Sequence, residues 1–488
     1  MATYDFDIGI IGGGSAGLTI AAGAAQLGAK TLLIEKEKEL GGDCLHFGCV
    51  PSKTLIKTAK VYHQMKNAKA YGLPDAEVKP VEFPPIAKRI RNVIEAILQH
   101  DSAERFCGLG ARVEIGNPVF VDEHGVSLDG VPLTAKNWVI ATGSSPVIPP
   151  IAGLDKTTCM TNRDIFTLDR LPRSMIIIGG GPIGIEMGQA FNRLGTAVTV
   201  VELGGTILPK EDKDMADLVM GVLQAEGIQF RLNATVLRAV SAGSQHEVMI
   251  KIADTTEALC ADTILVAAGR RANLVGLGLE GIGIEFDGRG LKLDERLRTT
   301  QKHIYGAGDA TGGYQFTHAA GYEGGIVVSN AVFHLPRKVD YTYLPWCTFT
   351  DPELASIGMN EKAASDAGIR YSVWSDNFHE NDRSLAEGET TGKIKMILDE
   401  TEKPIGVQIL GPRAGDLLAE WVAVFNGRTS LSTLASAVHP YPTLGEINKK
   451  VAGTFLSTKI FSEPVKKGLK LFFSLRGRAC EPAAQRPQ

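Results

Sequence analysis

The sequence is poor in cysteine and lacks any segment suited to secretion or membrane insertion. Its seven cysteines are an odd number spread over 488 residues, so a framework of structural disulfides is not indicated. The chain enters a strand-like run at Phe6 with no basic and apolar leader pattern before it, and no uninterrupted apolar run is long enough to span a bilayer. These absences predict a cytoplasmic protein.

The charge balance shows no strong excess of either sign. The formal net charge is -4, with 22% charged and 44% hydrophobic residues, which is typical of a globular protein and gives no reason to expect a nucleic acid as partner. The length exceeds what one hydrophobic core holds, so about two to four domains are expected. Glycine is abundant: its 55 residues form short clusters after apolar runs, which indicates nucleotide-binding turns.

Cys44 and Cys49 lie in the segment Gly41–Lys53, GGDCLHFGCVPSK. A helix expected from Pro51 onward places both thiols at or just before a helix N-terminus, where the dipole favours a thiolate. Two thiols at this spacing can close and reopen a small disulfide ring. The alternatives are a buried core pair or half of a zinc site, but zinc needs more ligands at close spacing, and no further cysteine follows before Cys107. The segment therefore predicts a redox pair.

A first dinucleotide fingerprint follows the apolar strand Phe6–Ile11. A glycine-rich turn leads into a helix over Leu18–Gly28 and a second strand over Lys30–Ile34, which is closed by an acidic residue. Such a turn lets the backbone approach a pyrophosphate at the helix N-terminus, while the carboxylate accepts hydrogen bonds from the ribose hydroxyls. The candidate contacts are Gly12, Gly14, Ser15, Ala16, Gly17, Glu35 and Lys36.

The same pattern recurs after the strand Met175–Ile178. A helix through Asn192 and a strand over Ala197–Val201 follow the turn. Two fingerprints in one chain imply two dinucleotides and a two-electron relay. The candidate contacts of the second site are Gly179, Gly181, Ile183, Gly184 and Glu202.

The acidic residue of the second fingerprint predicts NADH over NADPH. Glu202 occupies the position that reads the ribose, and a carboxylate there repels a 2′-phosphate. No arginine stands immediately beside it, although Lys210 is a few residues on.

These motifs together resemble the FAD-dependent pyridine nucleotide–disulfide oxidoreductases, a group that includes dihydrolipoamide dehydrogenase, glutathione reductase and mercuric reductase. The resemblance runs from Tyr4 to about Phe461 and extends to the start of a C-terminal dimerisation domain at Pro345–Ile357. Further matching positions are Ala141, Thr142 and Gly143 in one strand-end turn, Gly269 and Arg270 in its partner, and Gly308 and Asp309 in a second FAD segment.

The resemblance implies an α/β homodimer that binds FAD and NAD(H). Two Rossmann-like dinucleotide-binding domains would precede an α+β dimerisation domain. The implied boundaries are 1–148 for the first part of the FAD domain, 149–269 for the NAD domain, 270–340 for the second part of the FAD domain, 341–463 for the dimerisation domain and 464–488 for a basic tail.

The resemblance also implies a path for electrons, from NADH to FAD, then to the dithiol, then to an acceptor. Cys49 would be the charge-transfer thiolate and Cys44 the exposed interchange thiol. Lys53 and Glu186 would form an ion pair beside the flavin, where charge appears on reduction. Gly42 and Asp43 join the implied cofactor contacts, as does Lys53.

Tyr441 departs from the pattern of relatives that handle dithiols. In those relatives a histidine directly precedes the Pro-Thr, and a glutamate five residues later orients it as a base for the partner subunit. Here Tyr441 takes that position and Glu446 keeps its place. A phenol with an ordinary pKa of about 10 is a poor base. His439 could substitute only if the loop shifts, because two extended residues span about 6.6 Å; the alternative is a structural histidine.

A tyrosine at this position resembles mercuric reductase, in which a phenol helps to ligate the metal. No CxxC metal-carrier domain precedes Tyr4, and the C-terminus offers only Cys480 in place of a vicinal pair. We therefore expect a mercuric-reductase-like enzyme without these delivery parts, with no resident metal but with a Cys44–Cys49 pair able to bind a soft metal transiently.

Two alternatives stay open: a dihydrolipoamide-dehydrogenase-like enzyme that uses His439, or a redox-sensing or membrane-associated binding protein. The acceptor would be a small molecule or a metal thiolate. Two further segments carry predictions: Ile86–Cys107 as one amphipathic helix with Cys107 in the core, and the tail as a helix that lies on an anionic membrane, docks on its own dimer or frays. The tail's basic residues are Lys466, Lys467, Lys470, Arg476 and Arg478, and they alternate with Leu469, Leu471, Phe472, Phe473 and Leu475.

Overall fold

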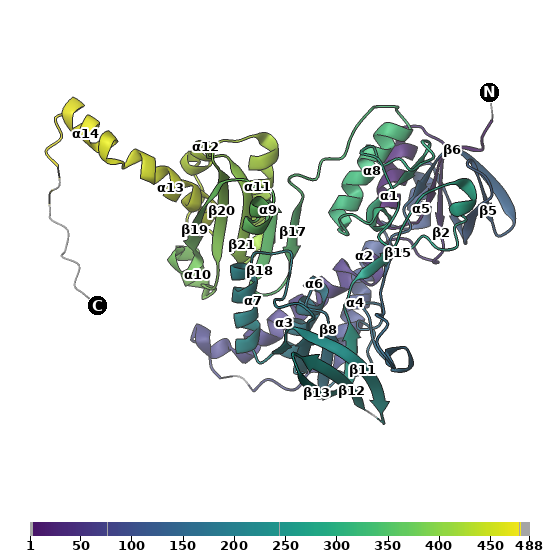
Figure 1. The fold of residues 1–488 in the computed structure, drawn as a ribbon, viewed down its shortest axis with the longest axis horizontal. Coiled ribbons are helices and arrows are strands. Elements are labelled where there is room, and N and C mark those ends of the chain that lie inside the picture. Colours follow the sequence, from purple (N-terminus) through teal and green to yellow (C-terminus); the bar gives the residue numbers. More distant parts are fainter. Residues whose placement is uncertain (1–2, 76, 244, 478, 480–488) are drawn as a thin grey trace. The chain divides into compact units, whose positions relative to one another are not determined.

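The computed structural model describes residues 3–75, 77–243, 245–477 and 479. The chain forms two compact units (Figure 1). The first holds the chain up to Leu344 together with Thr348–Thr350, and the second holds Pro345–Cys347 and the chain from Asp351 onward.

The first unit begins with a seven-stranded sheet in the order β3-β2-β1-β6-β5-β4, in which β16 also pairs with β6. Its parallel strands are β1 (Phe6–Ile11), β2 (Thr31–Glu35), β3 (Ala111–Ile115), β6 (Val131–Ile140) and β16 (Ile304–Gly306). The antiparallel strands β4 (Pro118–Phe120) and β5 (Gly125–Leu128) extend it beyond β6. All five residues of β2 are buried, as expected for a parallel strand that is covered on both faces.

Two helices rich in small residues pack together in this unit. They are α1 (Ser15–Gln26) and α8 (Thr317–Ala331), which lie side by side in Figure 1. Gly324 of α8 leaves little room for a side chain, because a Cβ there would lie 3.1 Å from Thr19 of α1. The small residues therefore allow the close approach of the two helix backbones.

A second parallel sheet, also in the first unit, has the order β10-β9-β8-β14. Its strands are β8 (Ser174–Ile178), β9 (Ala197–Val201), β10 (Gln229–Arg231) and β14 (Thr263–Val266), with α6 (Pro182–Leu194) connecting the first two and α7 (Lys213–Ala225) following β9. A separate antiparallel sheet consists of β11 (Ala234–Ala242), β12 (Gln245–Ile252) and β13 (Thr255–Ala261). The short strands β7 (Ser144–Pro146) and β15 (Arg270–Ala272) pair with each other.

The second unit is a five-stranded sheet with the strand order β17-β18-β21-β20-β19, and helices pack against it. The strands are β17 (Pro345–Thr348), β18 (Glu353–Gly358), β19 (Tyr371–Asn377), β20 (Lys393–Asp399) and β21 (Pro404–Gly411). The helices α11 (Ala414–Gly427) and α13 (Glu446–Ile460) contact this sheet, and α12 (Leu431–Ser436) contacts α13. The predicted α/β class, with two dinucleotide-binding sheets and an α+β C-terminal domain, is confirmed.

The single helix predicted over Ile86–Cys107 is wrong. The structure has α4 (Phe83–Leu98) and α5 (Ala103–Gly108) instead. The Ser102 side chain caps α5 by accepting from the Arg105 N–H, and a capping serine after a polar stretch starts a new helix. Cys107, expected in the core, is exposed.

The tail forms α14 (Glu463–Phe472), and the described residues end shortly after it, so the predictions for Arg478 and Cys480 lie outside them. Across the described part of the chain, none of the helices combines the length and the hydrophobicity needed to cross a membrane.

Candidate active site

The first glycine-rich turn joins β1 to α1. Gly12 has a φ of +112°, which only glycine adopts readily, and a Cβ at Gly17 would collide with the carbonyl oxygen of Gly12. The carboxylate of Glu35, the last residue of β2, accepts a hydrogen bond from the Gly13 N–H at 2.6 Å. The turn therefore leaves the N-terminus of α1 open beside a fixed carboxylate.

The second turn repeats this construction between β8 and α6. Gly179 has a φ of +116°, and a Cβ at Gly184 would collide with the carbonyl oxygen of Gly179. Glu202 follows β9 and accepts from the Gly180 N–H at 2.6 Å and from the Gly204 N–H at 2.7 Å. The two glycine-rich turns therefore have the same local geometry, each with a carboxylate that accepts a hydrogen bond from a backbone N–H of the turn.

The remaining residues predicted at these turns occupy the same segments. Gly14 and Gly181 are the N-cap residues of α1 and α6, and neither has a side chain that satisfies the helix N–H groups. Ser15, Ala16 and Gly17 form the first turn of α1, Ile183 and Gly184 the first turn of α6, and Lys36 follows β2. Open N–H groups at a helix N-terminus suit a phosphate.

Two further observations fit a dinucleotide at the first turn. Thr142 Oγ1 is a buried side-chain atom without a hydrogen-bond partner among the described residues. Gly42, with a φ of +59°, lies so close to Gly14 that a Cβ would come within 2.8 Å of the Gly14 Cα. The buried Thr142 hydroxyl can hydrogen-bond to a cofactor, and the close pair of glycines leaves room for a dinucleotide to approach the protein backbone.

Asp43, Arg270 and Asp309 form one network. Arg270 Nη2 donates to Asp43 Oδ2 at 2.9 Å, and Arg270 Nε donates to Ser144 Oγ at 2.8 Å. The Ser144 hydroxyl in turn donates to Asp309 Oδ2 at 2.5 Å. Burial raises the pKa of Asp309. The network thus joins the Gly41–Lys53 segment to the turns after β6 and before β15 and to the segment that contains Gly308 and Asp309.

The neighbours of this network complete the predicted set. Ala141, Thr142 and Gly143 follow β6, Gly269 precedes β15, and Gly308 begins a single 3-10 turn at Gly308–Thr311. The prediction missed Asn162, whose side chain donates to the Phe47 carbonyl oxygen at 3.0 Å and to Asp43 at 3.3 Å.

The two thiols sit on consecutive helices. Cys44 lies within the short helix α2 (Gly42–His46), and Cys49 is the first residue of α3 (Cys49–Lys66), which begins two residues earlier than predicted. Both are free thiols in this structure. Cys49 is exposed and Cys44 half-buried. The roles of Cys49 as the thiolate that faces the flavin and of Cys44 as the interchange thiol stay a prediction.

Thr317 contacts both sulfur atoms. Its Oγ1 donates to Cys44 Sγ at 3.0 Å and lies 3.5 Å from Cys49 Sγ. It is the first residue of α8 and is 273 positions from Cys44. The sequence analysis did not single out this residue.

The thiols differ in their affinity for a proton. The hydrogen bond with Cys44 is the largest of the causes that lower the pKa of Cys49 to about 6, and Thr317 and the positive charge of Lys53 act in the same direction. The same hydrogen bond raises the pKa of Cys44. In the dithiol form the negative charge is therefore favoured at Cys49 over Cys44.

Lys53 and Glu186 form an ion pair between α3 and α6. Lys53 Nζ lies 2.8 Å from Glu186 Oε2 and 4.5 Å from the centre of the Phe349 ring. The second carboxylate oxygen of Glu186 accepts from the Phe349 N–H at 2.8 Å. Glu186, at 6% exposure, is satisfied on both oxygens while buried.

A second buried carboxylate lies further along α8. Glu323 is fully buried, accepts from the Gly308 N–H at 2.6 Å and accepts from the Tyr341 hydroxyl at 2.6 Å. Burial raises the pKa of Glu323 to about 7. The prediction did not single out this residue, although it stands alone as an acid in a helix of small residues.

The three remaining predicted residues lie in the second unit. Tyr441 is 71% exposed, and its hydroxyl donates to Asp382 Oδ2 at 2.9 Å, which raises the pKa of the phenol. Glu446 opens α13 and accepts from the Thr443 N–H at 3.3 Å.

His439 is held against α11. Its side chain is 12% exposed, and Nε2 lies 2.9 Å from Glu420 Oε1. Its hydrogen bonds thus go to Glu420 and, through Nδ1 at 3.3 Å, to the Ala437 carbonyl oxygen. This arrangement favours the structural reading of His439, and neither Glu420 nor Asp382 was predicted as a partner.

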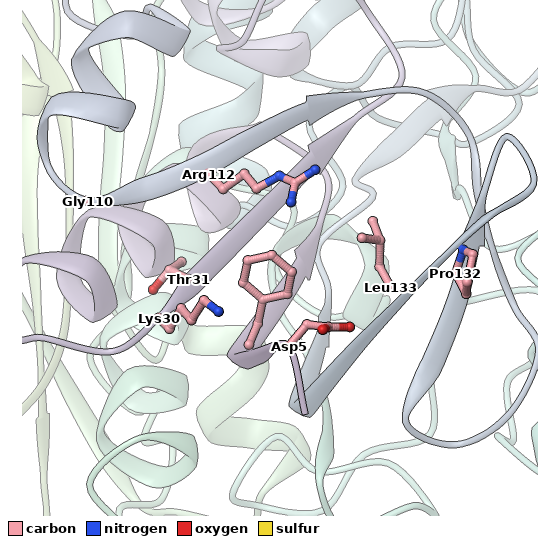
Figure 2. Close-up of a pocket in the computed structure, with 8 residues that line it drawn as sticks. Asp5, Lys30, Thr31, Gly110, Arg112, Pro132 and Leu133 are labelled. Atoms are coloured by element: carbon pink, nitrogen blue, oxygen red, sulfur yellow. The ribbon is translucent and has the colours of Figure 1, made fainter. Parts of the chain in front are cut away.

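A surface pocket of about 370 Å³ lies elsewhere in the first unit (Figure 2). Asp5, Lys30 and Arg112 line it, at the amino ends of the parallel strands β1, β2 and β3. Cofactor turns follow the carboxyl ends of such strands. This pocket therefore belongs to the opposite edge of the sheet from the redox segment.

Comparison with known proteins decides the family. Residues 6–324 match the pyridine nucleotide-disulphide oxidoreductase model, and residues 344–452 match the dimerisation domain of the same group. The chain belongs to the pyridine nucleotide-disulphide oxidoreductase family. It is therefore an enzyme of a family that uses FAD and a pyridine nucleotide, and the matched dimerisation domain indicates a homodimer.

Relatives named as two different enzymes have about the same sequence identity to the chain. A mercuric reductase from Bacillus cereus is 33% identical over 455 residues, covering 93% of this chain and 72% of that protein. A dihydrolipoyl dehydrogenase from Bacillus subtilis (strain 168) is 33% identical over 463 residues, covering 91% and 97%. The Cu(II) complex of the HOCl-induced flavoprotein disulfide reductase RclA from Escherichia coli matches with a TM-score of 0.83 at 27% identity, covering 93% and 100%.

Proposed function

We propose that the protein is an NADH-dependent reductase whose Cys44–Cys49 pair passes two electrons to a soft metal ion held as a thiolate complex. The observation that carries this proposal is Tyr441 at the position of the histidine base, together with the engagement of His439 by Glu420 at 2.9 Å. Oxidation of a dithiol near neutral pH needs a base that takes the thiol proton. A soft metal ion needs thiolate ligands instead, so its reduction does not require a histidine base at this position.

The residues of the first unit divide the work. FAD, when bound, relays two electrons from NADH to the disulfide. Residues 1–148 and 270–340 would hold it, and residues 149–269 would hold NADH. The ammonium group of Lys53, which Glu186 holds in place, puts positive charge near Cys49. Cys49 stays a thiolate at neutral pH, while Cys44 keeps its proton until a metal ion displaces it.

The overall reaction balances with one hydride equivalent. NADH, a proton and a bis(thiolate) complex of Hg(II) give NAD⁺, Hg(0) and two free thiols: the metal gains two electrons, NADH loses them, and each released thiolate takes one proton. During exchange, the metal–sulfur bonds to the carrier thiolates break and bonds to Cys44 and Cys49 form. Thiolate sulfur suits such exchange with Hg(II) and also binds copper.

The test is NADH oxidation by the FAD-loaded enzyme with Hg(II)–thiol and lipoamide in parallel. We expect metal-dependent turnover that is lost in Cys44→Ser and kept in Cys107→Ser, a matched change at an exposed cysteine outside the site. Metal-dependent turnover that survives in Cys44→Ser would sink the proposal.

The preference for NADH is part of the proposal. Glu202 is fixed by two backbone N–H groups at the ribose position, and a 2′-phosphate there would meet its charge. We expect a higher kcat/KM for NADH than for NADPH. In Glu202→Gln we expect the ratio of kcat/KM with NADH to kcat/KM with NADPH to be smaller. An equal or higher kcat/KM with NADPH in the unmodified enzyme contradicts this preference.

A second candidate is a dihydrolipoyl dehydrogenase. It is favoured by the extent of the match, which covers 97% of the Bacillus subtilis enzyme but only 72% of the mercuric reductase. Fast lipoamide turnover that is lost in His439→Gln would support this candidate.

A further inference from the structure

The helix α14 stands apart from the fold that the chain shares with its family. It follows α13 and extends away from the five-stranded sheet of the second unit (Figure 1). All ten residues of α14 are described, and none of them is buried. The helix therefore contributes no side chain to the core of the unit.

One side of α14 is apolar. Val465, Leu469 and Phe472 follow the spacing that places residues on one helix face, and Phe473 comes directly after them. Their exposures are 40% for Val465, 42% for Leu469, 87% for Phe472 and 67% for Phe473. A contiguous, exposed apolar face on a charged helix indicates a binding surface.

The same helix is basic in a chain that is acidic overall. Lys466, Lys467 and Lys470 lie on α14, and Arg476 follows it, whereas the whole chain has a net charge of -4. The one acid of the helix, Glu463, lies 3.0 Å from Lys466. Long basic side chains beside an apolar face can reach anionic head groups while the face enters the lipid.

The comparisons argue against the second subunit as the occupant of this face. The match to the dimerisation domain ends at residue 452, before α14 begins. The match to RclA covers 100% of that chain but 93% of this one. The matched dimerisation domain therefore does not include α14.

We propose that α14 lies flat on an anionic phospholipid surface, with Val465, Leu469 and Phe472 in the acyl boundary and its lysines at the head groups. The inference does not depend on which electron acceptor the enzyme uses. It identifies α14 as the part of the chain that brings a flavoprotein reductase to a membrane surface.

The test uses the full-length, FAD-loaded protein and co-sedimentation with vesicles of phosphatidylglycerol mixed with phosphatidylcholine. Each basic side chain near an anionic surface contributes about fivefold in binding, so a triple change of Lys466, Lys467 and Lys470 to Gln is expected to weaken partitioning about 100-fold. Leu469→Ser combined with Phe472→Ser removes the apolar contact and is expected to release the protein as well.

A matched control neutralises Lys88, Lys136 and Lys251, which are exposed on three other elements, and changes the net charge by the same amount. It is expected to bind like the unmodified protein, and all variants should retain flavin absorbance. The proposal is overturned if the unmodified protein does not bind anionic vesicles, or binds pure phosphatidylcholine vesicles equally well. It is also overturned if the control variant loses as much binding as the variant with Lys466, Lys467 and Lys470 changed to Gln. So does a chain ending at Phe461 that loses its dimer, because α14 would then serve the second subunit.

Discussion

The hydroxyl of Thr317 donates to the sulfur of Cys44 at 3.0 Å and lies 3.5 Å from the sulfur of Cys49. A hydrogen bond to a thiolate stabilises the charged form, so Thr317 lowers the pKa of Cys49. The first turn of α8 is therefore part of the redox site.

Thr317→Ala is expected to raise the pKa of Cys49 from about 6 by about one unit, because a hydrogen bond to a charged group is lost. The measurement is the rate of iodoacetamide alkylation against pH in the NADH-reduced protein. Thr317→Ser keeps the hydroxyl and should keep the profile. An unchanged profile in Thr317→Ala would show that Thr317 does not act on the thiolate.

Glu186→Gln is expected to destabilise the first unit by about 1–2 kcal/mol, since Lys53 loses its charged partner at a half-buried position. Thermal unfolding followed by circular dichroism measures the effect. Asp217→Asn breaks the exposed pair with Lys213 and serves as the control, with an expected cost of less than about 0.5 kcal/mol. Equal effects in the two variants would contradict a special role for the buried pair.

Glu323 makes stability depend on pH in a defined direction. Its pKa is raised from 4.5 to about 7 in the folded protein, so the folded state binds the proton more tightly. The resulting stabilisation, up to about 3 kcal/mol, is fully present below pH 4.5 and is lost as pH rises through 7.

Glu323→Gln mimics the protonated carboxyl. It should remove this pH dependence and make the protein more stable than the unmodified one above pH 7. Urea midpoints at acidic, neutral and alkaline pH provide the measurement, with Glu389→Gln, at a half-exposed acid, as the control. A parallel loss of stability at every pH would mean that the charged carboxylate is the stabilising form.

Tyr441→His is expected to raise the oxidation of dihydrolipoamide by about 100-fold, because a positioned imidazole base contributes on the order of 10²–10⁴ in rate. Steady-state NADH formation measures the gain. The variant Tyr441→Phe, which loses the hydrogen bond to Asp382 without adding a base, should show no gain. Equal rates in both variants would indicate that this position is not the base site.

The features that could be predicted from the sequence are local. Each fingerprint turn is specified by residues within one strand–turn–helix segment, so Gly12 and Gly179 could be assigned without knowing the rest of the chain. The start of α3 was missed by two residues. The single helix predicted over Ile86–Cys107 is two helices, because the Ser102 side chain caps α5 and so starts a new helix.

The features that could not be predicted join distant positions. Thr317 and Cys44 are 273 positions apart, and His439 and Glu420 are 19 apart on different elements. No periodicity records such contacts, since they arise only when the tertiary structure brings the elements together. The family resemblance supplied the Lys53–Glu186 pair, but it offered no information about Thr317 or Glu323.

One helix, α8, links the sulfur atom of Cys44 to the segment that begins at Gly308. Thr317 and Glu323 lie on the same helix, six positions or about 9 Å apart along its axis, and they hold Cys44 at one end and the Gly308 N–H at the other. A shift of α8 along its axis would displace both contacts together. The hydrogen bond to Cys44 and the hydrogen bond to the Gly308 N–H therefore both depend on the position of α8, and a substitution at Gly324, where α8 packs on Thr19, is expected to disturb both.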